Sequence, residues 1–371
     1  MYCHIPFCAS TCDFCSFYQE KPRRSDLERY LKGMDLEFSK LPQDISFSTI
    51  FWGGGTPSLL SAKDLKKLGE SMLKNINSDF SEWTVEMAPS TVKVDKLKVL
   101  LELGVTRFSL GVQSFNAKVL ESLGRLHNPL QVKIAWERIA LSGVKETNID
   151  LMFALPDQSL ELWRKDLIEA NYLQSTHLST YCLTFEEDTA LYLKLAEGKL
   201  KIDEERERNF YINTWDTLEN FGFKQYEISN FARSYSSMCK HNINTWEMNN
   251  WIGCGPSAAS QFLAKRYRNP SNLDSWLEVL QGRNNLLEDI TPLNEEMLFV
   301  DRILFGIRMD KGVHLNNLLK QYTFKKNTDD YRKLFRELED AKYVILKDGY
   351  YSLTREGKLR SDAIGLKLIS I

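Results

Sequence analysis

The sequence predicts an α/β fold built around a parallel sheet, followed by a small C-terminal α+β unit. Apolar β-type segments alternate with amphipathic helical segments over the first two-thirds of the 371 residues. This alternation is the pattern of a parallel sheet with helical crossovers. From residue 293, helical segments precede a strand–turn–strand pattern and a last helix, as in a winged-helix-like unit. The change of pattern predicts two domains, residues 1–232 and 233–371.

The predicted strands follow one another at regular intervals. They are residues 50–52, 83–88, 107–113, 148–156, 177–185 and 225–230. Ser25 and Glu28 form a capping-box pattern ahead of the first helix, Ser61 opens the second helix, and Gly104 is placed to end the third. The pattern leaves open whether the sheet is a partial barrel, a complete barrel or a doubly wound sheet.

The C-terminal part has its own signals. Residues 231–260 are expected to be loop-rich. Asp348 and Gly349 lie between two β-type segments, and this dipeptide is a strong hairpin signal.

Composition and charge are those of a globular protein without a general affinity for polyanions. The chain is 43% apolar and 26% charged, with a net charge of −2. Nucleic acid is therefore not an expected partner. No apolar run approaches the roughly 18 residues of a membrane helix, and the first residues lack the features of a signal peptide. We expect a cytoplasmic protein, with docking at a membrane surface left open.

Four of the seven cysteines lie in the first fifteen residues, which suggests a metal site before a disulfide. Cys8, Cys12 and Cys15 supply soft thiolates suited to iron–sulfur or zinc. Three thiolates on a [4Fe–4S] cluster leave one iron open to a small molecule. Spacing alone also allows a zinc site completed by His4 or Cys3. Cys3 is more simply a small buried thiol on the opposite face of its strand.

The residues around these cysteines carry a resemblance. The segment YCHIPFCASTCDFCSF is similar to the signature of the radical-SAM superfamily, in the branch of oxygen-independent coproporphyrinogen III oxidases and HemW heme chaperones. Further matching segments follow in family order: FWGGGTPS (51–58), VEMAP (85–89), GVTRFSLGVQSF (104–115), LGRLH (123–127), IDLMFALPDQ (149–158), YEISNFA (226–232) and HNINTW (241–246). The resemblance implies a partial β/α barrel, with a [4Fe–4S] cluster and S-adenosylmethionine (SAM) as cofactors.

The resemblance also implies roles for residues near the cluster. Cys8, Cys12 and Cys15 would ligate three irons, and SAM would chelate the fourth through its amino and carboxylate groups. Tyr2 and Phe14 match positions that line the cluster and SAM. Both could instead be core aromatic residues.

A glycine turn follows the strand at residues 50–52. Backbone without Cβ atoms can approach a ligand closely, and the absence of a GK[ST] ending excludes a typical phosphate loop. The resemblance implies that Gly54, Gly55 and Thr56 contact the methionine end of SAM; a plain tight turn is the alternative. Glu86 lies in an apolar strand, where a carboxylate needs a cationic partner such as the amino group of SAM.

Three further polar residues lie near strand ends or in the loops beyond them. Parallel α/β folds bind ligands at that edge. The resemblance implies that Gln113, Arg125 and Asp150 contact SAM or a second ligand beside it. Each could instead have a structural role in a salt bridge or hydrogen bond.

His241 heads the segment HNINTW, which resembles the branch motif HNxxYW with Thr245 in place of the tyrosine. Imidazole is a common axial ligand of heme iron, so His241 is the candidate heme contact. The alternative is a loop histidine that caps backbone groups.

Three functions are considered. The first is a chaperone that binds heme and a SAM-ligated cluster and delivers heme to an unidentified acceptor protein. The second is a coproporphyrinogen III oxidase, in which SAM yields a radical for oxidative decarboxylation. Such oxidases resemble CxxxCxxCxC, whereas Phe17 stands at the last position here, and the motif begins at residue 2. Both features favour the chaperone, with SAM cleavage left open. A zinc-dependent nucleic-acid regulator is the third, and the charge balance disfavours it.

Overall fold

The computed structural model describes residues 1–76, 79–284, 286–322 and 328–371. These residues form a nine-stranded sheet in the order β7-β8-β6-β5-β4-β3-β2-β1-β9, with β1 to β6 parallel. The strands are β1 (Tyr2–Ile5), β2 (Thr49–Gly54), β3 (Glu82–Met87), β4 (Arg107–Gln113), β5 (Glu146–Phe153), β6 (His177–Cys182), β7 (Lys224–Gln225), β8 (Asn230–Ala232) and β9 (Gly253–Cys254). Because this order is linear, β7 and β9 are the edge strands and the sheet is not a closed barrel. The α/β class and the parallel sheet of a partial barrel are confirmed.

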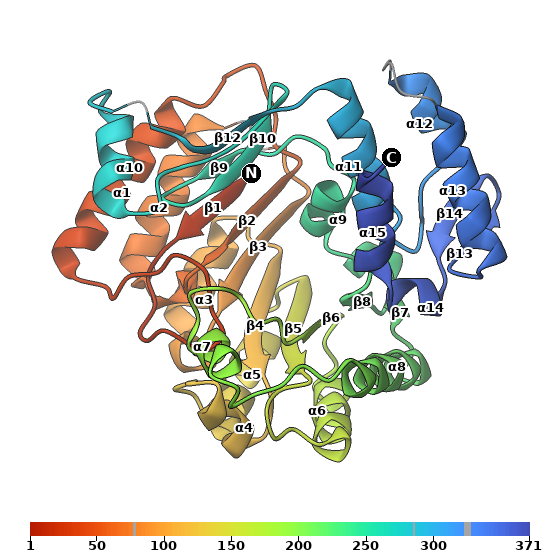
Figure 1. Cartoon of the computed structure of the whole chain (residues 1–371). Coiled ribbons are helices and arrows are strands. Elements are labelled where there is room, and N and C mark those ends of the chain that lie inside the picture. Colours follow the sequence, from red (N-terminus) through yellow and green to blue (C-terminus); the bar gives the residue numbers. More distant parts are fainter. Residues whose placement is uncertain (77–78, 285, 323–327) are drawn as a thin grey trace.

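Helices connect the parallel strands and cover the outer face of the sheet (Figure 1). They are α1 (Arg24–Ser39), α2 (Ala62–Asn75), α3 (Val94–Glu102), α4 (Ala117–Ser122), α5 (Pro129–Leu141) and α6 (Leu160–Tyr172). The helices α7 (Ala190–Ala196) and α8 (Glu204–Asn220) follow β6, the last parallel strand. Alternation along each strand separates two environments. On β3, Trp83 and Val85 join the hydrophobic core, whereas Glu82, Thr84 and Glu86 face the interior of the partial barrel.

The helix signals were partly correct. Ser61 caps α2 by accepting a hydrogen bond from Asp64 N at 3.1 Å. The predicted capping box at Ser25 is wrong, because α1 already begins at Arg24 and its N-cap residue makes no side-chain capping bond. Glu28 instead pairs with Arg24 within the helix, at 2.9 Å.

The predicted strand at 225–230 is wrong as one element. The chain turns back on itself there, so β7 and β8 pair antiparallel with each other and β8 pairs antiparallel with β6. Residues 231–260 are loop-rich as expected, but they also contain α9 (Lys240–Trp246). The Glu82 carboxylate accepts hydrogen bonds from Lys240 N at 3.0 Å and His241 N at 2.9 Å. It therefore satisfies free N–H groups of α9 from a distant strand.

The predicted domain boundary at residue 232 falls inside the sheet and is corrected. β9 hydrogen-bonds to β1, with Cys3 beside Cys254. The following elements also pack on the first unit; they are β10 (Ala259–Phe262), β11 (Lys265–Arg268), α10 (Leu273–Leu280) and β12 (Glu288–Pro292). Trp276 of α10 is buried in the main core against Tyr30. The first unit therefore extends beyond residue 280.

The C-terminal unit has its own hydrophobic core, which contains residues from Phe299 to Leu368. Its elements are α11 (Glu295–Gly306), α12 (Leu315–Gln321), α13 (Thr328–Asp340), β13 (Val344–Lys347), β14 (Tyr350–Leu353), α14 (Arg355–Lys358) and α15 (Ser361–Ile369). Asp348 and Gly349 both have positive φ and join the hairpin β13–β14 as predicted.

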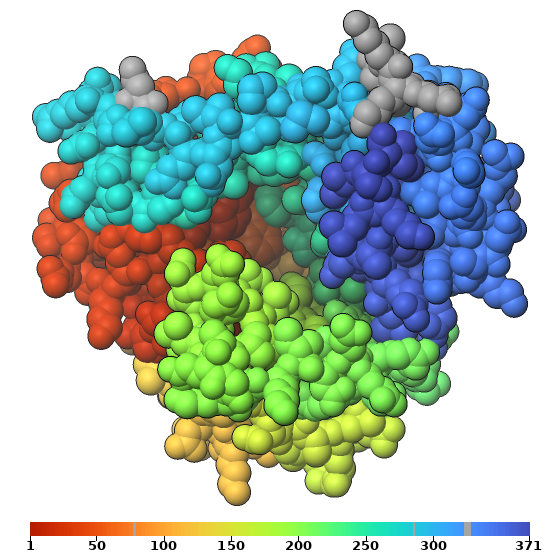
Figure 2. Space-filling view, viewed as in Figure 1, coloured from red at the N-terminus to blue at the C-terminus, as the bar shows by residue number. Residues whose placement is uncertain are grey.

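The molecule is hollowed between its N-terminal segment, the segment that contains α7, and α15 (Figure 2). Within the described ranges, no helix is both long enough and apolar enough to span a membrane.

Candidate functional site

A cavity of about 480 Å³ lies at the C-terminal side of the parallel strands. Eleven of the residues that the sequence predicted as ligand contacts line it. They are Cys8, Cys12, Phe14, Cys15, Gly54, Gly55, Thr56, Glu86, Gln113, Arg125 and Asp150. These residues come from the segment after β1 and from β2, β3, β4 and β5 and their loops. This is the edge at which parallel α/β folds bind ligands.

The cysteines lie on a loop, residues 8–20, that we call the cysteine loop. Its two ends are joined by a hydrogen bond from Cys8 N to Glu20 O at 3.0 Å. Its middle is held at Asp13, whose N–H donates to Leu123 O at 3.1 Å and whose carbonyl accepts from Leu191 N at 3.0 Å. Contacts to α4 and α7 therefore fix this loop over the cavity.

The three thiols of the cysteine loop are free and face the cavity. Cys8 Sγ lies 3.5 Å from Thr56 Oγ1, and Cys12 Sγ accepts from Arg125 Nη1 at 3.3 Å. Burial raises the pKa of Cys8, and it raises the pKa of Cys15 to about 11. The thiols of Cys8 and Cys15 therefore keep their protons until a metal displaces them.

The thiols fit a cluster of several irons. Among the described residues, no three Cys, His, Asp or Glu side chains converge closely enough to hold one metal ion. A [4Fe–4S] cluster bonds each cysteine through a different iron, so its thiolates stand around a cube. The extra ligands considered for zinc are engaged elsewhere. His4 Nε2 donates to Tyr18 O at 2.9 Å, and Cys3 is fully buried in the core.

Glu86 is a buried carboxyl group at the cavity wall that has few hydrogen-bond donors around it. The donor that the described residues offer it is Gly54 N, at 3.3 Å. Burial, and then the nearby Asp150, raise the pKa of Glu86 to about 8. An amino group in the cavity that donates hydrogen bonds to this carboxylate would relieve this cost.

The glycine turn has a packing reason that the sequence did not reveal. A Cβ on Gly53 would meet Glu86 Oε2 at 2.7 Å, and a Cβ on Gly55 would meet Ile5 O at 2.7 Å. Gly54 has φ +99°, and a Cβ there would clash with His4 Cε1 and Nδ1. The glycines therefore make room for protein atoms, while Gly54 and Gly55 also line the cavity.

Gln113 ends β4 at a bulge. Its φ is +67°, and the pairing of β4 with β5 shifts register between Gly111 and Gln113. Bulges and left-handed non-glycine residues often redirect side chains at binding sites.

Arg125 and Asp150 are also held in place. Arg125 Nη2 donates to Gly111 O at 2.8 Å, and its buried Nε has no hydrogen-bond partner in the described structure. Asp150 accepts from Ser109 Oγ at 2.8 Å and from Asn148 Nδ2 at 2.9 Å. Burial raises the pKa of Asp150, although these donors and Arg125 oppose the shift.

The two other predicted residues are not among those that line the cavity. Tyr2 donates to His4 Nδ1 at 3.1 Å, and its pKa is raised by burial and by the Glu86 charge. His241 lies in the first turn of α9, and the residue is 8% exposed. Its Nδ1 is 3.0 Å from Thr49 Oγ1, and its ring stacks on Phe51.

Some lining residues were missed by sequence reasoning. Tyr181 and Cys182 at the end of β6 line the cavity, as do Met152, Phe17 and Glu186. Alternation along β6 could have found Tyr181, which shares a strand face with His177 and lies at the C-terminal end. Cys182 was expected to be structural.

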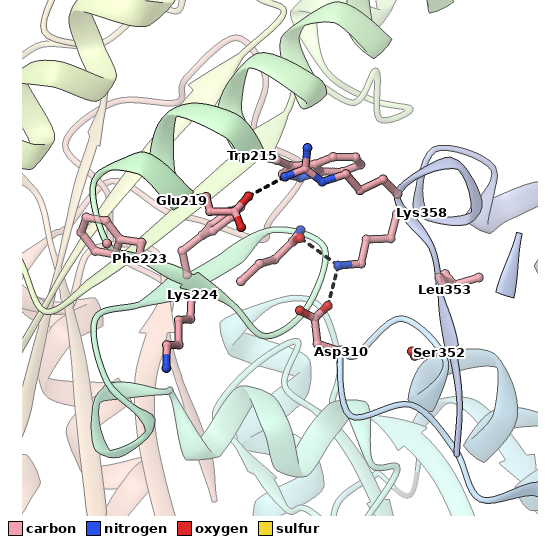
Figure 3. Close-up of a pocket in the computed structure, with 12 residues that line it drawn as sticks. Trp215, Glu219, Phe223, Lys224, Asp310, Ser352, Leu353 and Lys358 are labelled. Atoms are coloured by element: carbon pink, nitrogen blue, oxygen red, sulfur yellow. Dashed lines mark hydrogen bonds and ion pairs between the residues drawn. The ribbon is translucent and has the colours of Figure 1, made fainter. Parts of the chain in front are cut away.

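A larger cavity of about 650 Å³ lies at the seam between α8 and the C-terminal unit (Figure 3). Lys358 Nζ donates to Gln225 Oε1 at 2.8 Å and to Asp310 Oδ1 at 2.5 Å. Arg355 Nη2 donates to Glu219 Oε2 at 2.7 Å. Since these charges neutralise one another, we assign this cavity to the contact between the units.

Comparisons with known proteins agree with the cofactors that the residues of this cavity suggest. Residues 2–167 match the family model of the Radical SAM superfamily. The chain is 30% identical to a protein named heme chaperone HemW from Bacillus subtilis, over 98% of this chain and 97% of that one. It is 35% identical to another so named from Buchnera aphidicola, over 97% and 95%. The mitochondrial radical S-adenosyl methionine domain-containing protein 1 of Danio rerio is 32% identical, over 98% and 85%.

The fold is also found among solved structures. Coproporphyrinogen III oxidase (HemN) from Escherichia coli, described as a radical SAM enzyme, superposes with a TM-score of 0.83 at 22% identity. The match covers 99% of this chain and 89% of that one. It shows that both chains have the same fold.

Proposed function

Because this chain belongs to the HemW family of radical SAM proteins, we propose that it is a heme chaperone that carries a SAM-ligated [4Fe–4S] cluster. The main observation behind the proposal is the cavity, which is lined by three free thiols and by the buried carboxyl group of Glu86. Cys8, Cys12 and Cys15 would hold three irons, and SAM would occupy the remaining coordination site.

The other lining residues have the right chemistry for SAM. The Glu86 carboxylate suits the amino group of SAM, and the guanidinium of Arg125 suits its carboxylate. Gly54, Gly55 and Thr56 form the wall beside Glu86. When bound, the cluster and SAM together supply radical chemistry. The protein residues bind the ligand, orient it and shield it from water.

Heme binding and delivery to an acceptor protein are proposed from the relatives named heme chaperones. Contact between His241 and heme stays a prediction. The buried ring and its hydrogen bond to Thr49 support a structural role for His241 instead. A heme contact there would require α9 to move.

The test is anaerobic reconstitution followed by heme titration and a turnover assay. Wild type should show a Soret band that saturates with heme, and it should pass heme to an apo-hemoprotein. His241→Ala is compared with His314→Ala, a histidine from the C-terminal unit, so that a general loss of affinity is recognised. Failure of the wild type to bind heme would reject the chaperone.

The oxidase is tested in the same preparation. Phe17 stands where the oxidase motif has a further cysteine, and its side chain is 64% exposed at the cavity. We expect no conversion of coproporphyrinogen III to protoporphyrinogen IX with SAM and reductant. Sustained product above a Cys12→Ala control would favour the oxidase.

A further inference from the structure

A chain of buried hydrogen bonds leads from the cavity into the interior of the partial barrel. Asn148 Nδ2 donates to Asp150 Oδ1 at 2.9 Å, and Asn148 Oδ1 lies 2.6 Å from His177 Nδ1. His177 Nε2 lies 2.8 Å from the hydroxyl of Tyr226. Asn148, His177 and Tyr226 are each at most 5% exposed. Asp150 alone of these residues lines the cavity.

The carboxylate of Asp150 determines which group donates in each hydrogen bond of this series. An ionised carboxylate only accepts, so Asn148 must turn its NH₂ group toward Asp150. Its carbonyl oxygen then faces His177, which must donate from Nδ1. His177 Nε2 is left to accept from the hydroxyl of Tyr226. Ser109 agrees with this direction, because its Oγ donates to Asp150 Oδ2 at 2.8 Å and accepts from Asn148 at 2.7 Å.

At the other end of this hydrogen-bond series, the direction of the bond between Tyr226 and His177 is also determined. The hydroxyl oxygen of Tyr226 accepts from Cys239 N at 3.3 Å, so its proton is free to point at His177. Burial and the nearby charge of Arg107 hold the pKa of His177 well below its usual value. The imidazole is therefore neutral, and one tautomer satisfies both of its neighbours.

We propose that His177 is a positioning residue that acts through Asn148 to hold the Asp150 carboxylate in its orientation toward the cavity. Ser179 Oγ also donates to Asn148 Oδ1, at 3.3 Å. Without the shorter bond from Nδ1, the amide of Asn148 can turn its oxygen toward Asp150. Two oxygens would then repel each other, and Asp150 would leave its present rotamer. The role rests on the proposed function, because Asp150 is taken to be a contact of SAM.

The experiment separates the two nitrogens of His177. An asparagine side chain places its amide near Nδ1, whereas a glutamine side chain reaches the position of Nε2. His177→Asn should keep SAM affinity within about twofold of wild type, and His177→Gln should weaken it about tenfold, the worth of one buried hydrogen bond. Calorimetry on anaerobically reconstituted protein, at matched iron content, measures both.

Tyr226→Phe is the control for stability. It removes the hydroxyl at the far end of the chain but leaves the Nδ1 donor in place. This variant should melt at a lower temperature and still bind SAM like wild type. If His177→Asn and His177→Gln weaken SAM equally, or if neither does, the positioning role is wrong.

A second measurement does not depend on SAM. The sequence contains five histidines, so ¹⁵N spectra of histidine-labelled full-length protein can resolve the imidazole of His177. We expect the Nδ1–H tautomer throughout the neutral pH range. The Nε2–H tautomer would overturn the inference even if SAM binds. If wild type with a full cluster fails to bind SAM, the proposed function is rejected, and the positioning role falls with it.

Discussion

At the scale of single residues, Glu86 has opposite effects in the free and the liganded protein. Its pKa is raised to about 8 by burial and by Asp150. A carboxyl whose folded pKa is raised stabilises the fold below its usual pKa and loses that contribution as pH rises through about 8. Glu86→Gln should therefore stabilise the SAM-free protein at pH 8 and above, by about 1 kcal/mol after allowance for solvent in the cavity. Thermal unfolding measures this, and a lower melting temperature would contradict it.

The same substitution should weaken SAM binding. The loss of one charge-assisted hydrogen bond costs about 1.5–3 kcal/mol, or roughly 10- to 150-fold in affinity. Because the amino group of SAM needs the ionised carboxylate, wild type should bind SAM more tightly as pH rises from about 6 to 8. Calorimetry in two buffers of different ionisation enthalpy should show proton release. Unchanged affinity in Glu86→Gln would remove Glu86 from the site.

The cysteines allow an internal control. Cys8→Ala, Cys12→Ala and Cys15→Ala should each lose the cluster, because each removes one thiolate from the cavity. Cys3→Ala should keep iron and sulfide at wild-type levels, because Cys3 is fully buried beside Cys254. Mössbauer spectra and sulfide analysis decide. Tetrahedral zinc without sulfide, or iron loss in Cys3→Ala, would contradict the assignment.

Individual residues of the cavity were predictable where a motif fixed them. The loop spacing and the carboxylate in an apolar strand pointed to Cys8, Cys12, Cys15 and Glu86. Tyr181 was not predicted, although alternation along β6 places it on the same strand face as His177. The site of His241 was not predictable either, since its neighbour Thr49 is far away in the sequence.

At the scale of elements, α7 holds the cysteine loop. Leu191 is 1% exposed and packs in a small apolar cluster that includes Phe14 at its edge. Leu191→Ala should loosen this contact by about 2–4 kcal/mol and speed the release of iron to a chelator. Lys194→Met is the matched variant. Its ion pair with Asp13, 3.0 Å long, is partly exposed and worth less than about 1 kcal/mol.

The outcome distinguishes packing from charge. Slow iron release in Lys194→Met and fast release in Leu191→Ala are expected. Equal rates in Leu191→Ala and wild type would show that α7 does not hold the loop. Among the elements, the parallel strands were predictable from apolar runs. α9 was not, because the group that satisfies its first N–H groups is Glu82 of β3.

At the scale of the whole molecule, ion pairs join α8 to the C-terminal unit. Arg355 pairs with Asp216 and Glu219, and Arg208 pairs with Glu356 at 2.6 Å. These side chains are roughly half exposed, so salt should screen them. Hydrogen exchange in α14 should become faster when salt is raised from about 0.1 to 1 M.

Arg355→Met serves as the comparison. This variant lacks two of the pairs and should exchange quickly at both salt concentrations, whereas α2 on the outer face should not respond. Salt-independent exchange in wild-type α14 would show that apolar contacts dominate the seam. The separate C-terminal unit was predicted from the sequence. Its boundary was not, because the pairing of β9 with β1 joins segments far apart in the chain.

The position of β1 has a consequence for biosynthesis. This strand precedes the cysteine loop, yet it lies between β2 and β9 in the sheet. Tyr18 of the same loop accepts a hydrogen bond from Leu273 N at 3.0 Å. A ribosome must therefore synthesise most of the protein before the surroundings of the three cysteines exist. We expect iron–sulfur assembly to act on a polypeptide synthesised beyond residue 273, because until then β1 can pair with β2 but the other contacts of this region are missing.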